Sequence, residues 1–244
     1  MRFVLRSLIT ALALALTRCN PSPMTQDSSM LRHDPADVYQ GPALRLAEAI
    51  RRGDHGGLRT LAASHRDAVD STGMKGIPLL AWAIGHDDPT ATEILLSAGA
   101  DPNVTFPIGA WKMSLVSLAA SAQDPRFLAS LLRHGADPGG LPDTEPPLFS
   151  AIKADRYDRI EPLLRAGADI NQRDSAGKTA LLMMALTGDY PQALAFVRLG
   201  ADPSIAMNNG TTLERLISKF PAEPGTPQHA AQIELMGWLH RAPR

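Results

Sequence analysis

Apolar residues recur along this chain at the spacing of short amphipathic helices. Counting back seven, four and three positions from Gly135 gives Leu128, Leu131 and Leu132, and the same spacing precedes Gly167. Residues at i, i+3 and i+4 lie on one face of an α-helix. The stripe therefore predicts a helix with one buried side that ends at the glycine.

The glycine belongs to a phrase that returns at a nearly fixed interval. The four glycines are separated by 36, 32 and 33 residues and are Gly99, Gly135, Gly167 and Gly200. A second set of landmarks, with spacings of 36, 33, 33 and 32 residues, is formed by Leu79, Leu115, Leu148, Leu181 and Leu213. A small residue follows each of the first four of these leucines three or four positions later and lets a neighbouring helix approach closely. A fixed period of this size is typical of repeat proteins.

Each period predicts two short helices joined by a turn. The landmark leucine begins the first helix, and the apolar stripe marks the second. Asp88-Pro89 and Asp124-Pro125 place an N-cap acceptor before a first-turn proline, which favours a helix start. Glycine after the second helix permits a left-handed backbone, where a side chain costs about 1–2 kcal/mol. Six units are predicted over residues 43–241, near 43–75, 76–111, 112–144, 145–176, 177–209 and 210–241.

These patterns resemble the ankyrin repeat. Asp174, Gly177, Thr179 and Leu181 match the family pattern D-x-x-G-x-T-P-L, and Gly200 matches its terminal glycine. The resemblance implies an all-α ankyrin-repeat solenoid of about six helix-turn-helix units with short finger loops. The histidine that is usual after the landmark leucine is absent from every unit, so the family's Thr–His hydrogen bond is not expected.

Composition narrows the classes of partner. The chain has 24 basic and 25 acidic residues and a formal charge of -1, so no net positive field attracts nucleic acid. We therefore expect no nucleic-acid partner. The single cysteine excludes an internal disulfide and a thiolate zinc site.

The N-terminus has the pattern of an export signal. Arg2 and Arg6 precede an apolar stretch, 7–17, that is shorter than the ~20 residues of a membrane-spanning helix. We predict a signal peptide over residues 1–18 and a flexible polar linker over 19–42. The protein is expected to be exported, and to be either periplasmic or a membrane-anchored lipoprotein facing the periplasm.

Cys19 directly follows the apolar stretch. Residues 16–19 resemble the lipoprotein box of bacteria, although Arg18 replaces the small residue that the box has before its cysteine. Lipidation of Cys19 would supply acyl chains that anchor the protein in a membrane. Cleavage nearby by the ordinary signal peptidase, or no cleavage, are the alternatives.

Catalytic signals are weak. The densest polar cluster is His86, Asp87 and Asp88, which could serve a metal or an acid–base pair. We place it in a loop between helices, where Asp88 has a capping role. No nucleotide-binding glycine loop and no nucleophile motif occurs in the sequence. We expect a non-enzyme without a cofactor or metal, and a hydrolytic or metal-dependent enzyme is the less favoured alternative.

The resemblance implies that the concave face and the finger loops bind another protein. The longest finger loop, 104–112, carries Phe106, Ile108 and Trp111. They are candidate anchors, because a few aromatic residues supply most of the binding energy at interfaces. The alternative is that they fold back over the core. Further candidates in the finger loops are Asp143, Glu145, Arg173, Asp174, Lys178, Met207, Asn208 and Asn209.

The function expected from these features is that of a non-enzymatic protein–protein interaction module in the bacterial cell envelope. We expect it to be a monomer that reaches a membrane only through a lipid on Cys19. An immunity-type inhibitor of an envelope-acting toxin would use the same surface and stays open as the alternative.

Overall fold

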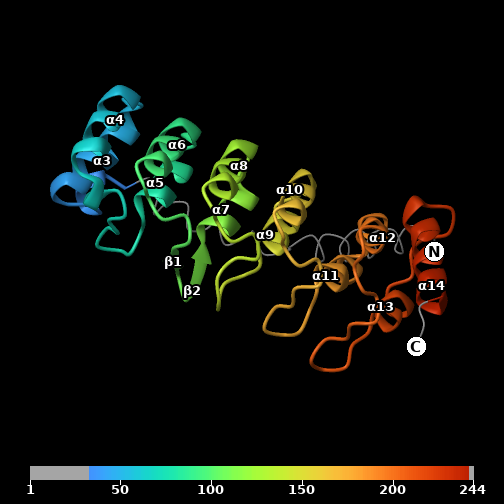
Figure 1. The fold of residues 1–244 in the computed structure, drawn as a ribbon. Helices are drawn as coiled ribbons and strands as arrows, with labels where there is room; N and C mark the ends of the chain where they lie inside the picture. Colours follow the sequence, from blue (N-terminus) through green and yellow to red (C-terminus); the bar gives the residue numbers. More distant parts are fainter. Residues whose placement is uncertain (1–32, 242–244) are drawn as a thin grey trace, which may run out of the picture.

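The fold is a single row of helix pairs (Figure 1). The computed structural model describes residues 33–241, so the predictions for the signal peptide and for Cys19 concern residues outside this range. The first helices of the six pairs are α3 (Gly41–Arg52), α5 (Leu79–Gly85), α7 (Leu115–Ser121), α9 (Pro147–Lys153), α11 (Ala180–Thr187) and α13 (Leu213–Lys219). The second helices are α4 (His55–Ser64), α6 (Pro89–Ser97), α8 (Pro125–Arg133), α10 (Ile160–Arg165), α12 (Tyr190–Arg198) and α14 (Pro227–Arg241). The predicted all-α solenoid is confirmed.

Shorter elements complete the described chain. Three 3₁₀ turns precede or extend helices, namely η2 (Pro35–Asp37), η3 (Arg66–Ala68) and η4 (Tyr157–Arg159). Two strands, β1 (Thr105–Ile108) and β2 (Trp111–Ser114), form an antiparallel hairpin.

The helices lie in two layers. First helices contact one another, as α7 does α9, and second helices contact one another, as α4 does α6 and α6 does α8. Within each unit the two helices also contact, so the core runs continuously between the layers. No unit buries its apolar stripe alone, and each depends on its neighbours.

The landmark leucines lie in this core, but they do not all occupy the same helical position. Leu79, Leu115 and Leu213 directly follow the N-cap, whereas Leu148 and Leu181 are the second residues of their helices. All five are at most 1% exposed. The one-residue offset is tolerated because the residues around them in α5, α7, α9 and α11 are buried too.

Small residues and one tryptophan fill the space between first helices. Ala83, Ala119 and Ala151 are fully buried, as the close approach of neighbouring helices requires. Trp82 is also fully buried; its Nε1 donates a hydrogen bond to the Ala47 carbonyl oxygen, and its ring meets Tyr39 edge to face at 5.5 Å. Trp82 therefore ties the first two units together.

The repeated phrase ends the second helices as the sequence predicts. Gly99, Gly135, Gly167 and Gly200 have φ values between 84° and 106°. A Cβ at any of the four would have open space around it, so the backbone conformation alone selects glycine. The aspartate two positions later accepts a backbone N–H, as Asp101 does from Asn103 at 2.8 Å.

A further hydrogen bond links these turns from one unit to the next. The Asn103 side chain accepts from Asp137 N at 2.8 Å and donates to the Gly135 carbonyl oxygen at 3.0 Å. Asn171 accepts from Asp202 N at 2.8 Å in the same manner. The turn residues thus fix the rise from unit to unit as well as their own local geometry.

Aspartate caps four of the second helices. Asp88 accepts from Ala91 N at 2.8 Å and Asp124 from Arg126 N at 2.8 Å, so both predicted N-caps are confirmed. Asp54 and Asp189 cap α4 and α12 in the same way. A side-chain acceptor at this position satisfies a backbone donor that the helix leaves unpaired.

The predicted linker is too long at its C-terminal end. Residues 33–42 include η2 and the start of α3, and Val38 and Tyr39 are buried in the first unit. Tyr39 donates its hydroxyl hydrogen to the Ile77 carbonyl oxygen at 3.0 Å. Because the stretch before them is polar, the sequence analysis assigned these two apolar residues to the linker, although they pack in the core of the first unit.

Among residues 33–241, no helix combines the length and apolarity needed to cross a bilayer.

Truncation of a landmark leucine should destabilise the stack. Leu148→Ala removes a fully buried side chain from α9 and leaves a cavity, so we expect a loss of about 2–5 kcal/mol in the free energy of unfolding. Urea denaturation followed by circular dichroism measures it. An unchanged midpoint would contradict the packing described here, and Glu214→Ala, on the exposed side of α13, is the control.

Candidate functional site

The loops that join each second helix to the next first helix project to one side of the row (Figure 1). We call these loops fingers 1 to 5, which are residues 65–78, 98–114, 134–146, 166–179 and 199–212. They bring together, on one edge of the molecule, all eleven residues that the sequence offers as partner contacts.

Finger 2 is a β-hairpin, which the sequence analysis did not predict. Its register pairs Phe106 with Met113 and Ile108 with Trp111, so these four side chains share one face of the hairpin. The turn begins with Gly109 at φ 57°, as a two-residue hairpin turn requires. Because the strands are only four residues long and Pro107 interrupts the alternation, no period-2 pattern stood out in the sequence.

The hairpin face changes from buried to exposed along its length. Phe106 is 5% exposed and packs in the core, Ile108 is half-buried against the core, and Trp111 is 78% exposed. Phe106 therefore follows the alternative in which the loop folds back over the core, and it is not available as a partner contact. Trp111 remains as an aromatic side chain displayed at the tip.

Finger 1 supports the opposite face of the hairpin. A Cβ on Gly76 would lie 3.1 Å from Pro107 Cδ, so the two fingers touch at this point. Finger 1 is itself fixed, because Met74 N donates to the Val38 carbonyl oxygen at 2.7 Å. The Met74 side chain is largely exposed, and Gln40 Nε2 lies 3.9 Å from its sulfur.

The two candidates of finger 3 differ in their surroundings. Asp143 is exposed and adopts a left-handed backbone with φ 60°. Glu145 is half-buried, accepts from the Ser150 hydroxyl at 3.0 Å and forms an ion pair with Lys153. Glu145 thus holds finger 3 against α9, and only Asp143 of this pair is free to face a partner.

Fingers 4 and 5 are bonded to one another. Arg173 donates to the Ala206 carbonyl oxygen at 3.1 Å and to Asn208 Oδ1 at 3.0 Å. Asn208 Nδ2 donates in return to the Ser175 carbonyl oxygen at 3.0 Å. Arg173 and Asn208 therefore set the spacing of the two fingers.

The remaining candidates shape their own fingers. Asp174 accepts from Lys178 N at 2.8 Å and lies 3.4 Å from Lys178 Nζ. Asn209 accepts from Thr211 N at 3.0 Å, and Met207 packs against the core. These bonds are local, whereas the bonds between fingers 4 and 5 were missed because they depend on partners that only the stacked loops bring close.

The first helices offer little side-chain surface beside the fingers. In α5, α7, α9 and α11 almost every side chain is buried, and the exposed exceptions at their C-terminal ends include Lys153 and Leu186. A partner approaching this side would therefore meet the fingers before it meets the helices.

The polar cluster at 86–88 has structural roles. His86 Nδ1 lies 2.9 Å from the Trp82 carbonyl oxygen, and Asp87 adopts a left-handed turn with φ 53°. Asp88 caps α6 and lies 2.8 Å from His55 Nε2 of the preceding unit. Within residues 33–241 the structure gathers no set of three His, Cys, Asp or Glu side chains that could hold a metal.

Charged pairs join the second helices on the face away from the fingers. Glu93 of α6 pairs with Arg133 of α8 at 2.6 Å and lies 3.1 Å from His134 Nε2. Burial alone would raise the pKa of Glu93, but hydrogen bonds from Ser130 and His134 and the charge of Arg133 outweigh burial and lower it. Arg198 of α12 pairs with Glu234 of α14 at 2.9 Å.

Comparison with known proteins agrees with this architecture. No protein-family model matches the chain. The ankyrin repeat protein EF0377 superimposes with a TM-score of 0.64 at 22% identity, over 84% of this chain and 100% of that one. An ankyrin repeat domain from Acinetobacter baumannii AYE superimposes with a TM-score of 0.65 at 23% identity, over 78% and 97%.

Proteins that are similar in sequence match smaller parts of the chain than the solved structures do. Protein PhlB from Serratia liquefaciens is 34% identical over 144 residues, which are 58% of this chain and 61% of PhlB. The ankyrin repeat and SOCS box protein 6 of Mus musculus is 30% identical over 105 residues, 42% of this chain and 25% of the relative. The chain thus spans less than two thirds of the length of these relatives. The solved structures show that the chain has the ankyrin-repeat fold, and part of its sequence is similar to that of a protein with ankyrin repeats.

The pair across α6 and α8 should make stability depend on pH. A carboxyl whose pKa is lower in the folded state contributes stability above its unfolded pKa of about 4.3, and this contribution is lost as the pH falls through the folded value. Glu93→Gln should therefore cost about 0.5–1 kcal/mol at pH 7, as expected for a surface pair, and nothing near pH 3. Urea midpoints of both proteins across this range measure it, and a pH-independent difference would contradict the pairing.

Proposed function

We propose that this ankyrin-repeat protein is a non-enzymatic module that binds a partner protein in the bacterial cell envelope. The observation that carries the proposal is the exposure of Trp111, 78% at the tip of a hairpin whose base is buried. A large aromatic side chain is costly to leave in water, and interfaces concentrate their binding energy in such residues.

The support beneath Trp111 favours binding. Its strand is paired along four positions, Phe106 fixes the base of the hairpin in the core, and finger 1 touches the other face at Pro107. A side chain presented on an ordered support loses less conformational entropy on association than one on a free loop. Met74 and Asp143 on the flanking fingers extend the same edge.

The neighbouring polar candidates support the fingers instead of contacting the partner. Arg173 and Asn208 form hydrogen bonds with each other and with backbone carbonyl groups of the fingers. Glu145 forms an ion pair with Lys153. We propose that these residues act indirectly, by keeping the fingers in register for the partner. The roles found for His86, Asp87 and Asp88 leave catalysis at that cluster without a supporting observation.

The envelope location rests on the N-terminal sequence. Two arginines, an apolar stretch and Cys19 in immediate succession have the order of an export and lipidation signal. We propose that Cys19 is lipidated and that residues 20–32 tether the folded units, which begin at η2, to a membrane.

Loss of the exposed indole should weaken partner binding. Full-length protein captures its partner from native envelopes, mass spectrometry identifies it, and the purified pair is titrated by calorimetry. We expect Trp111→Ala to raise the Kd at least about tenfold, because a central aromatic anchor is typically worth more than 1 kcal/mol.

The matched control is the neighbouring exposed residue of the same strand. Lys112→Ala should change the Kd less than Trp111→Ala, while both variants keep the thermal midpoint of the wild type, since both side chains are exposed. Equal affinity of Trp111→Ala and wild type would sink the proposal for finger 2. The identity of the partner separates an envelope enzyme from a toxin.

Lipidation has a direct chemical test. Cells grown with radiolabelled palmitate should label the wild-type protein and leave Cys19→Ser unlabelled, because the chain has no other cysteine. Membrane fractionation of the two proteins gives a second readout. Absence of label from the wild type would exclude the anchor.

A further inference from the structure

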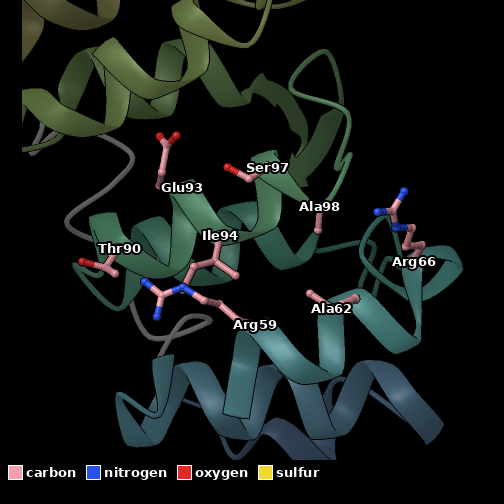
Figure 2. Close-up of a pocket in the computed structure, with 9 residues that line it drawn as sticks. Arg59, Ala62, Arg66, Thr90, Glu93, Ile94, Ser97 and Ala98 are labelled. Atoms are coloured by element: carbon pink, nitrogen blue, oxygen red, sulfur yellow. The ribbon is translucent and has the colours of Figure 1, made fainter. Parts of the chain in front are cut away.

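A groove lies between the second helices of units 1 and 2, on the layer away from the fingers (Figure 2). It has a volume of about 400 Å³ and lies between α4 and α6. Its lining includes Arg59 and Arg66 on the side of α4 and Ile94, Ser97 and Ala98 on the side of α6.

The middle of the groove is made of small and apolar side chains. Ala62 and Ile94 are buried in it, and Ala98 is half-buried. Short side chains at this position keep the surface low, so the backbone of another helix could come close. The groove is therefore shaped for an elongated ligand with an apolar side.

The two arginines are the unusual feature of the groove. In the same layer Glu93 pairs with Arg133 between α6 and α8, and Arg198 pairs with Glu234 between α12 and α14. Within residues 33–241 the guanidinium groups of Arg59 and Arg66 form neither an ion pair nor a hydrogen bond with another side chain.

Glu93 is the acidic residue of the groove, but it is not paired with Arg59 or Arg66. Its side chain lines the groove, but its carboxylate is bound by Arg133 and His134 on the far side of α6. Figure 2 shows Arg59 toward the Thr90 end of the groove and Arg66 beyond the Ala98 end. The groove thus carries an uncompensated positive charge toward each end and an apolar middle.

The spacing of the charges indicates the ligand. Arg59 lies within α4, whereas Arg66 is the first residue of η3, beyond the end of α4, and the two side chains lie toward opposite ends of the groove (Figure 2). A single small anion could meet only one of them. An amphipathic helix that carries carboxylates two or more turns apart on one face, with apolar residues between them, could reach both ends of the groove.

We propose that the α4–α6 groove binds an acidic amphipathic helix of a partner protein, with one carboxylate on Arg59 and another on Arg66. This surface lies on the opposite layer from the fingers, so it goes beyond the function proposed above and does not depend on it. A chain with both surfaces could hold two proteins at once.

The test uses a fluorescent synthetic helix of about 20 residues, rich in alanine and leucine, with two glutamates seven positions apart. Fluorescence anisotropy with the full-length protein at low salt should give saturable binding with a Kd below about 100 µM. The variant Arg59→Ala with Arg66→Ala should raise this Kd at least about tenfold, since two charge pairs are lost. The matched control, Arg45→Ala with Arg51→Ala, removes the same charge from exposed positions of α3 and should leave the Kd unchanged.

Charge reversal provides the second arm. The variant Arg59→Glu with Arg66→Glu should bind a peptide in which lysines replace the two glutamates, and reject the original peptide. Equal loss of affinity in the α3 control would show a general charge effect and overturn the proposal. Absence of saturable binding, or arginine-dependent binding to phosphatidylglycerol vesicles without binding to the peptide, would also overturn it. Trp111→Ala should bind the peptide like wild type, which separates this result from the test of the fingers.

Discussion

Burial of each unit's apolar stripe against the next unit is the interaction on which the rest of the structure depends. The helices of the units are six to fifteen residues long, and helices of this length are marginal on their own. Stacked, they bury the landmark leucines and bring alanines such as Ala83 and Ala119 into helix contacts. Each unit contacts only its neighbours, so the stacking of neighbouring units sets the positions of the fingers and of the groove between α4 and α6.

Backbone polar groups at the turns give this stack its precise spacing. Aspartates cap four of the second helices, left-handed glycines follow four of them, and Asn103 and Asn171 bond to the following turn. The finger residues continue the same principle, since Arg173 and Asn208 join two fingers directly. Polar side chains that look like contacts for a partner are in large part the means by which the fingers keep one arrangement.

The two layers present different chemistry. On the finger side, an aromatic anchor stands above buried apolar residues of its own hairpin, as Trp111 does above Phe106. On the other side, ion pairs join α6 to α8 and α12 to α14, whereas Arg59 and Arg66 at the α4–α6 groove have no acidic partner within residues 33–241. A solenoid separates such surfaces naturally, because first and second helices face opposite ways throughout the row.

The sequence by itself determined the repeat, the helix pairs, the glycine stops and the aspartate caps, because these follow from local backbone preference and from a periodic stripe of apolar residues. It did not distinguish Phe106 from Trp111, or Glu145 from Asp143, since their exposure depends on neighbours distant in the chain. The hairpin, the bonds between fingers and the unpaired arginines were likewise decided by the tertiary structure. Which charge finds a partner is settled only when residues about 40 positions apart, such as Glu93 and Arg133, are stacked together.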